Sequence, residues 1–132
     1  MNVLVDTCIW SLSLRRNNQK DIREAGILKE LIMDSRVSII GAVRQELLSG
    51  ISLPGHFNKL KDYLRAFPNI TVNEADYECA AEYYNVCRKK GIQGSNTDFL
   101  ICSVAMNRNM PIFTVDKDFI QFKKHIPILL YH

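Results

Sequence analysis

The chain has 132 residues, of which 47% are hydrophobic and 23% charged, a composition that is ordinary for a globular protein with one core. Its 17 Lys and Arg residues outnumber its 14 Asp and Glu residues by only three, too few to indicate a nucleic-acid partner by themselves. No apolar run approaches the roughly 20 residues of a membrane span, and no long apolar segment follows the N-terminus as in a secretory signal. We therefore expect one domain over residues 1–132, no membrane association and a cytoplasmic location.

The cysteines have neither CxxC spacing nor a pattern that indicates disulfides, and the three histidines are scattered, so a zinc site is not expected. Each cysteine lies in an apolar pattern, which predicts a small buried side chain. The four cysteines are Cys8, Cys79, Cys87 and Cys102.

Along the chain, apolar patterns predict four to five strands that alternate with helices. Strands are expected at 3–5, 36–40, 69–72, 111–115 and 127–131. Helices are expected at 21–34, 42–49, 57–67, 74–90, 98–108 and 118–124, with a short apolar element at 9–14 and a polar stretch at 15–20. This alternation predicts an α/β fold with a parallel sheet and helices on both faces.

Turn and cap signals predict the ends of several elements. Gly50 is expected to end the helix at 42–49, and Leu53-Pro54-Gly55 has the composition of a turn. Residues 91–97 are predicted to form a loop, with Thr97 as the N-cap of the helix that Asp98 begins.

Four carboxylates are placed where such a fold could gather them. Asp6 and Asp116 each follow an apolar strand, and ligands of open α/β sheets bind beyond the carboxyl ends of the strands. Asp98 begins a helix, and Glu46 lies in a short helix directly after a strand. Taken singly, Asp98 fits a first-turn helix acid, Asp116 a turn residue and Glu46 a solvated helix position. Asp6 is harder to explain this way, because a buried charge is costly.

If the four acids converge without cations, their pKa values are expected to rise or the acids to move apart, so the cluster favours bound cations. Two like charges about 4 Å apart repel by about 4 kcal/mol at an effective dielectric constant near 20. Oxygen ligands without nearby His or Cys favour Mg²⁺ or Mn²⁺. A metal site of this kind is suited to phosphodiester hydrolysis, in which the ions activate water and stabilise the leaving oxygen.

Four motifs in this order resemble PIN-domain ribonucleases, and especially the VapC-type toxins of toxin–antitoxin pairs. The resemblance covers nearly the whole chain. It depends on the segments Val3-Leu4-Val5-Asp6-Thr7, Glu46-Leu47-Leu48-Ser49-Gly50, Asp98-Phe99-Leu100-Ile101 and Thr114-Val115-Asp116-Lys117-Asp118-Phe119. It implies a three-layer α/β/α domain around the parallel sheet.

The resemblance also implies roles for individual residues. Asp6 and Asp98 would be the principal metal ligands, and Asp116 would hold the metal directly or through water. Glu46 would bind the metal or orient the attacking water. Thr7 and Thr114 would be supporting hydroxyls, and Asp118 would be either a further ligand or, as we prefer, the N-cap of the last helix.

From the same resemblance we expect an Mg²⁺- or Mn²⁺-dependent endoribonuclease acting on tRNA or rRNA. A VapB-type antitoxin and homodimer formation are the expected protein contacts. The region 9–14 and the helix at 57–67 are candidate contact surfaces, although core packing explains both equally well. Basic residues that could line an RNA groove are Arg15, Arg16, Arg44, Lys117 and Lys123.

Two other classes of protein are weighed against this hypothesis. A catalytically silent PIN-like module that binds RNA or protein would be expected to have lost one of the four acids. A phosphotransfer domain with Asp6 as nucleophile would be expected to have a second Asp two residues later, where this chain has Cys8.

Overall fold

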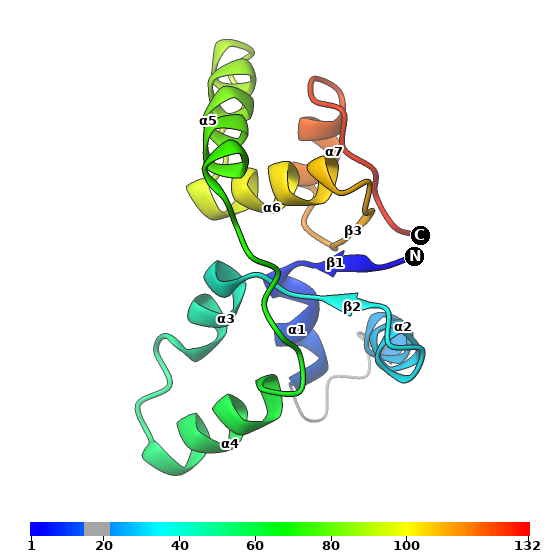
Figure 1. The fold of residues 1–132 in the computed structure, drawn as a ribbon, viewed down its shortest axis with the longest axis vertical. Coiled ribbons are helices and arrows are strands. Elements are labelled where there is room, and N and C mark those ends of the chain that lie inside the picture. Colours follow the sequence, from blue (N-terminus) through cyan, green and yellow to red (C-terminus); the bar gives the residue numbers. More distant parts are fainter. Residues whose placement is uncertain (15–21) are drawn as a thin grey trace.

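The computed structural model describes residues 1–14 and 22–132 (Figure 1). The predicted polar stretch at 15–20, which contains Arg15 and Arg16, lies outside the described residues. In chain order the elements are β1 (Val3–Val5), α1 (Thr7–Leu14), α2 (Ile22–Met33), β2 (Val37–Ser38), α3 (Gly41–Leu48), α4 (Pro54–Leu64), α5 (Glu74–Lys89), α6 (Asn96–Asn107), β3 (Ile112–Phe113) and α7 (Asp118–Lys123).

The sheet is parallel, and its strand order is β2-β1-β3. Val3 pairs with Val37 on one side of the central strand, and Leu4 pairs with Ile112 on the other. All three residues of β1 are completely buried, as expected for the middle strand of a parallel sheet covered by helices. The α/β class and the parallel sheet are thus confirmed.

The sheet is smaller than the predicted four to five strands. The segment at 69–72 forms a single parallel bridge, from Ile39 to Asn69, and the segment at 127–131 forms one from Ile112 to Leu130. The carbonyl of Thr71 accepts a hydrogen bond from Arg108 instead of from a strand. Pro127 has no N–H to donate to a ladder. Apolar composition therefore predicted extended backbone at both edges, but the pairing ends after one residue.

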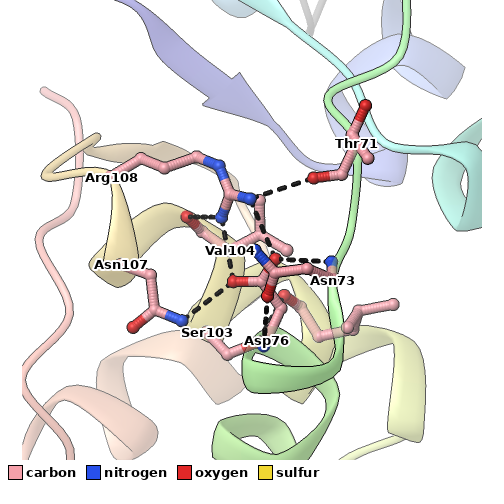
Figure 2. Close-up of polar contacts among 8 residues, drawn as sticks. Thr71, Asn73, Asp76, Ser103, Val104, Asn107 and Arg108 are labelled. Carbon is pink, nitrogen blue, oxygen red and sulfur yellow. Dashed lines mark hydrogen bonds and ion pairs between the residues drawn. The ribbon is translucent and has the colours of Figure 1, made fainter.

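Helices flank the sheet, and in Figure 1 α5, α6 and α7 gather near β3 while α1 to α4 lie toward β1 and β2. α5 packs against α6, and an ion pair between the buried Asp76 and the partly exposed Arg108 joins the two helices (Figure 2). The rings of Phe99 on α6 and Phe122 on α7 lie 4.7 Å apart between their centroids and are fully buried. In the part of the chain that the structure describes, no helix has the length and apolar character needed to cross a membrane.

The helix termini agree with the sequence predictions only in part. α3 ends as predicted, with Gly50 at a φ of +87°, a conformation that glycine adopts without strain. α5 covers the predicted range almost completely. The predicted turn at 53–55 is wrong, because Pro54 and Gly55 already belong to α4. Proline is well suited to the first turn of a helix, because backbone N–H groups there have no acceptor within the helix.

Candidate active site

Asp6 follows β1 directly and is the most buried of the four candidate acids, with 5% of its surface exposed. Its Oδ1 accepts a hydrogen bond from the Thr7 amide at 2.8 Å. Its Oδ2 accepts from the Thr114 hydroxyl at 2.8 Å and from the Cys8 thiol at 3.3 Å. Burial raises the pKa of Asp6 above its ordinary value, the hydrogen bonds oppose that rise, and the negative charge of Asp116 adds to it.

Glu46 is linked to the same strand end through its neighbour. The Thr7 hydroxyl, at the start of α1, donates to Glu46 Oε2 at 2.9 Å across 39 residues of sequence. Glu46 is exposed on α3, so its other oxygen faces solvent-accessible space. This contact brings α3 to the carboxyl end of β1, as the short helix after β2 predicted.

Asp116 is connected to Asp6 through Thr114. The Thr114 hydroxyl, which donates to Asp6, also accepts a hydrogen bond from the Asp116 amide at 3.0 Å. Asp116 in turn caps the last helix, because its Oδ1 accepts from the Asp118 amide at 2.9 Å. Our prediction that Asp118 is the N-cap of α7 is therefore wrong: Lys117 occupies the N-cap position, Asp118 is the first helical residue, and Asp116 supplies the capping oxygen.

Asp98 lies in the first turn of α6 and takes part in a capping box. Its Oδ2 accepts from the Ser95 amide at 3.1 Å, and the Ser95 hydroxyl accepts from the Asp98 amide at 3.0 Å. The N-cap is thus Ser95 and not Thr97, and the helix begins two residues before Asp98. Burial raises the pKa of Asp98; Ser95 opposes this, while the charges of Asp6 and Asp116 add to it.

The four acids therefore share one neighbourhood at the carboxyl end of the sheet. Hydrogen bonds connect three of them through Thr7 and Thr114, and Asp98 lies close enough to Asp6 and Asp116 for their charges to raise its pKa. Within residues 1–14 and 22–132, the only ion pair joins Arg108 to Asp76, so no lysine or arginine there neutralises the four acids. Among the described residues, neutral hydrogen-bond donors alone offset the repulsion between the acids.

The donor set fits a hard divalent cation in chemistry, while its spacing is wider than a metal site requires. Glu46, Asp98 and Asp116 each use one carboxylate oxygen in the bonds above, and the described residues give no hydrogen bond to the other. Mg²⁺ and Mn²⁺ prefer such oxygen ligands. In the described part of the chain, however, no three Asp, Glu, His or Cys side chains converge closely enough to hold one ion as they stand.

Cys8 is the site residue that the sequence did not indicate. It was predicted to be a buried apolar side chain, yet it is only partly buried and contacts Asp6, Thr114 and the Val115 amide. Burial and the charge of Asp6 raise the pKa of the thiol, which keeps it protonated at neutral pH. Its position two residues after the strand-end acid was the one available signal. Of the other cysteines, Cys87 and Cys102 are buried as predicted.

The candidate basic residues differ in their surroundings. The Arg44 guanidinium donates to Asn69 Oδ1 at 3.0 Å and to the Phe67 carbonyl, so it fastens α3 to the segment after α4. Lys117 and Lys123 are exposed at the two ends of α7, and of the two only Lys117 directly follows Asp116 in sequence. Arg15 and Arg16 lie outside the described residues.

An α/β domain with acids gathered at the carboxyl ends of its parallel strands narrows the class of protein. The sequence matches the PIN domain family over residues 3–125, and the chain belongs to that family. No curated protein matches the chain.

Solved structures with the same fold are VapC and FitB toxins of toxin–antitoxin complexes. VapBC2 from Rickettsia felis, bound to a DNA fragment from its promoter, matches with a TM-score of 0.79 at 20% identity, covering 99% of this chain and 98% of that chain. FitAcB from Neisseria gonorrhoeae matches with a TM-score of 0.77 at 18% identity over 98% and 96%. VapBC-5 from Mycobacterium tuberculosis matches with a TM-score of 0.70 at 15% identity over 100% and 99%. At these identities the likeness supports the fold alone.

Proposed function

We propose that this protein is a metal-dependent endoribonuclease whose active site contains Asp6, Glu46, Asp98 and Asp116. The observation that carries the proposal is the burial of Asp6, with a raised pKa, next to Asp116 and Asp98 and without a cationic side chain among the described residues. A fold that holds carboxylates in this way gains most from binding a divalent cation. Membership of the PIN family, usually nucleases, supports the same activity.

In this proposal Asp6 and Asp98 are the principal ligands of Mg²⁺ or Mn²⁺. Asp116 binds the metal directly or through water, and Glu46 binds it or orients the attacking water. Glu46, Asp98 and Asp116 are more exposed than Asp6, and the carboxylate oxygen that each leaves outside the hydrogen bonds above would be offered to an ion near Asp6. When bound, the cation supplies activation of water and stabilisation of the charge that develops on the phosphate.

The protein's own contribution is to hold these acids in place. Thr114 and Thr7 fix the Asp6 carboxylate from opposite sides, and the capping box with Ser95 fixes Asp98. Each restraint comes from a backbone amide or a short hydroxyl side chain, so little side-chain entropy is lost when the site assembles. Asp118 remains a weaker candidate ligand, since its side chain is exposed at the start of α7.

The RNA substrate, which we take to be tRNA or rRNA in the cytoplasm, is an anion and needs cationic contacts beside the metal. Lys117 and Lys123 are the described candidates, because both are exposed at the ends of α7, the helix that follows Asp116. Arg44 is less available, since its guanidinium already binds Asn69 and the Phe67 carbonyl.

We further propose that the protein is the toxin of a toxin–antitoxin pair with a VapB-type antitoxin, and that it forms a homodimer. The structural neighbours were crystallised as VapBC and FitAB complexes. A groove of about 980 Å³ runs between α1 and α4, the two predicted contact surfaces, with Leu14 and Tyr63 exposed on its walls. Ile9 and Trp10, by contrast, are buried in the core. An exposed apolar groove of this size suits a short segment of a partner protein.

The activity is tested by incubating purified protein with total cellular RNA in the presence of Mg²⁺, Mn²⁺ or EDTA. We expect discrete fragments that require the metal and that disappear in D6N. D34N is the matched control, because Asp34 is exposed after α2 and makes no side-chain contact to the four acids. RNA binding without cleavage under either metal would instead identify a catalytically silent module.

The toxin proposal is tested by inducing the wild type and D6N separately in a bacterial host. Arrest of growth with the wild type and normal growth with D6N, at equal protein levels, is the expected result. Normal growth with both would contradict the toxin proposal, while the cleavage assay would still decide the nuclease activity.

A further inference from the structure

The Cys8 thiol joins the two strand ends that carry Asp6 and Asp116. It donates to Asp6 Oδ2 at 3.3 Å and accepts from the Val115 amide at 3.4 Å. It also lies 3.4 Å from the Thr114 hydroxyl, which itself binds both Asp6 and the Asp116 amide. The contacts of Cys8 with Thr114 and Val115 cross more than 100 residues of sequence, from the start of α1 to the segment between β3 and α7.

Thr114 alone does not define the position of Asp6 relative to Asp116. Its hydroxyl makes a single contact to Asp6 Oδ2 across the two strand ends, since the Thr7 amide that binds Oδ1 belongs to the same chain segment as Asp6. The thiol adds a second donor on the same oxygen, and its contact with the Val115 amide anchors that donor to the residue between Thr114 and Asp116. The two side chains together fix the distance of Oδ2 from the neighbouring strand end, while the Thr7 amide restrains Oδ1.

We propose that Cys8 is a positioning residue of the metal site, which holds Asp6 in register with the Thr114–Asp116 segment. This inference rests on the proposed function. Groups that hydrogen-bond to a metal ligand set its orientation, and removing one typically lowers metal affinity about 10- to 100-fold. Because Thr114 stays in place, we expect the lower end of that range.

The donor and acceptor capacity of Cys8 separates this role from simple packing. Serine keeps one donor and an acceptor at this position, whereas alanine and valine keep neither. Valine also fills the volume of the thiol, so it controls for a cavity left by alanine. Cys79 provides the matched control: it too is half-buried and free, but it lies on α5, and no hydrogen bond within the described residues links it to the four acids.

The experiment measures Mn²⁺ binding to the purified protein by isothermal titration calorimetry, without RNA. Wild type, C8S, C8A, C8V, C79A and D6N are compared, and thermal unfolding of each variant is followed in parallel. We expect C8A and C8V to bind Mn²⁺ about 10-fold more weakly than the wild type. C8S and C79A are expected to stay within a factor of about three, and D6N to lose the binding.

The outcomes separate the inference from the proposed function. Equal Mn²⁺ affinity in the wild type and in folded C8V or C8A would overturn the positioning role and leave the metal site intact. Failure of C8S to restore the affinity lost in C8V would also overturn it, since packing would then explain the loss. If the wild type binds no Mn²⁺, the proposed metal site itself is wrong, and the role of Cys8 falls with it.

Discussion

Arg108 at the end of α6 donates two hydrogen bonds to the buried carboxylate of Asp76 on α5 (Figure 2). Each of its terminal nitrogens lies 2.9 Å from one carboxylate oxygen. Asn107 and the Asn73 amide complete the hydrogen bonds to Asp76, which is 1% exposed. The same guanidinium donates to the carbonyls of Val104 and Thr71, so it also fastens the segment beside β2. One cation therefore connects α5, α6 and the segment beside the edge of the sheet.

Replacing Arg108 by an uncharged side chain is expected to lower the free energy of unfolding strongly. R108M leaves the Asp76 carboxylate buried without its partner, a loss of about 3–5 kcal/mol in the free energy of unfolding. The double variant D76L/R108M removes the buried charge as well and should recover part of the loss. Urea denaturation followed by fluorescence of Trp10, the one tryptophan of the chain and fully buried, measures both. R65M, at an exposed arginine, should stay within about 0.5 kcal/mol of the wild type.

The same pair predicts the direction of acid destabilisation. The hydrogen bonds from Arg108 hold the pKa of Asp76 well below its usual range. A depressed carboxylate pKa stabilises the folded protein above the unfolded-state value of about 3.9, and this stability is lost as the pH falls toward the folded-state pKa. We therefore expect the stability of D76N to respond less to pH below about 4 than that of the wild type. Parallel pH profiles of the two proteins would contradict this assignment.

At the candidate active site the pKa shifts have the opposite direction. Burial raises the pKa of Asp6 and Asp98, so their ionised forms destabilise the fold at neutral pH and the cost is relieved as the pH falls through the raised pKa. D6N should therefore be at least as stable as the wild type at neutral pH, by up to about 1 kcal/mol, and the advantage should shrink in acid. Thermal unfolding of the wild type, D6N and D34N across this pH range measures it.

Added metal provides the complementary measurement. A ligand that binds only the folded state at about 100 times its dissociation constant stabilises a protein by about 2.7 kcal/mol. We expect Mn²⁺ to raise the unfolding temperature of the wild type and of D34N, and to leave D6N and D98N unchanged. An equal rise in all four proteins would indicate ion binding elsewhere.

The strand-end acids could be predicted from the sequence because the signal is local. An apolar run that ends in a carboxylate places Asp6 and Asp116 at the carboxyl edge of a parallel sheet without knowledge of the strand order. The same local reasoning failed where two nearby residues compete for one role. Thr97 and Ser95 are both residue types that cap helices well. Ser95 is the N-cap in the structure, because Asp98 lies three residues after Ser95 and completes a capping box with it.

Contacts between segments that are distant in sequence could not be predicted from a local pattern. Cys8 looked like an apolar side chain because the partners that reveal its role, Thr114 and Val115, lie more than 100 residues away. Asp76 and Arg108 are separated by 32 residues on two different helices, and neither charge stands out from its helical pattern. The prediction of longer strands at the two sheet edges was wrong for the same reason. Strand pairing depends on which neighbouring groups already bind the backbone N–H and C=O groups.

Gly94, next to the N-cap of α6, gives a last prediction that connects packing with the site. A Cβ at this position would lie 2.6 Å from the ζ carbon of Phe122 and 2.9 Å from an ε carbon of Phe99. Both rings are fully buried and packed against each other, so neither can move aside without disturbing the core. We expect G94A to lower the free energy of unfolding by about 1–3 kcal/mol.

The matched variant is G26A in α2, where a Cβ meets nothing within 4 Å. Replacing a helical glycine by alanine there should stabilise the protein by about 0.5–1 kcal/mol. The two variants thus make the same chemical change with opposite expected signs in urea denaturation. Because Gly94 precedes Ser95, strain at this position also shifts the cap that holds Asp98, so G94A should bind Mn²⁺ more weakly while G26A should not. A G94A variant as stable as G26A would contradict this prediction, because it would show that the Phe99–Phe122 pair moves aside without cost to the core.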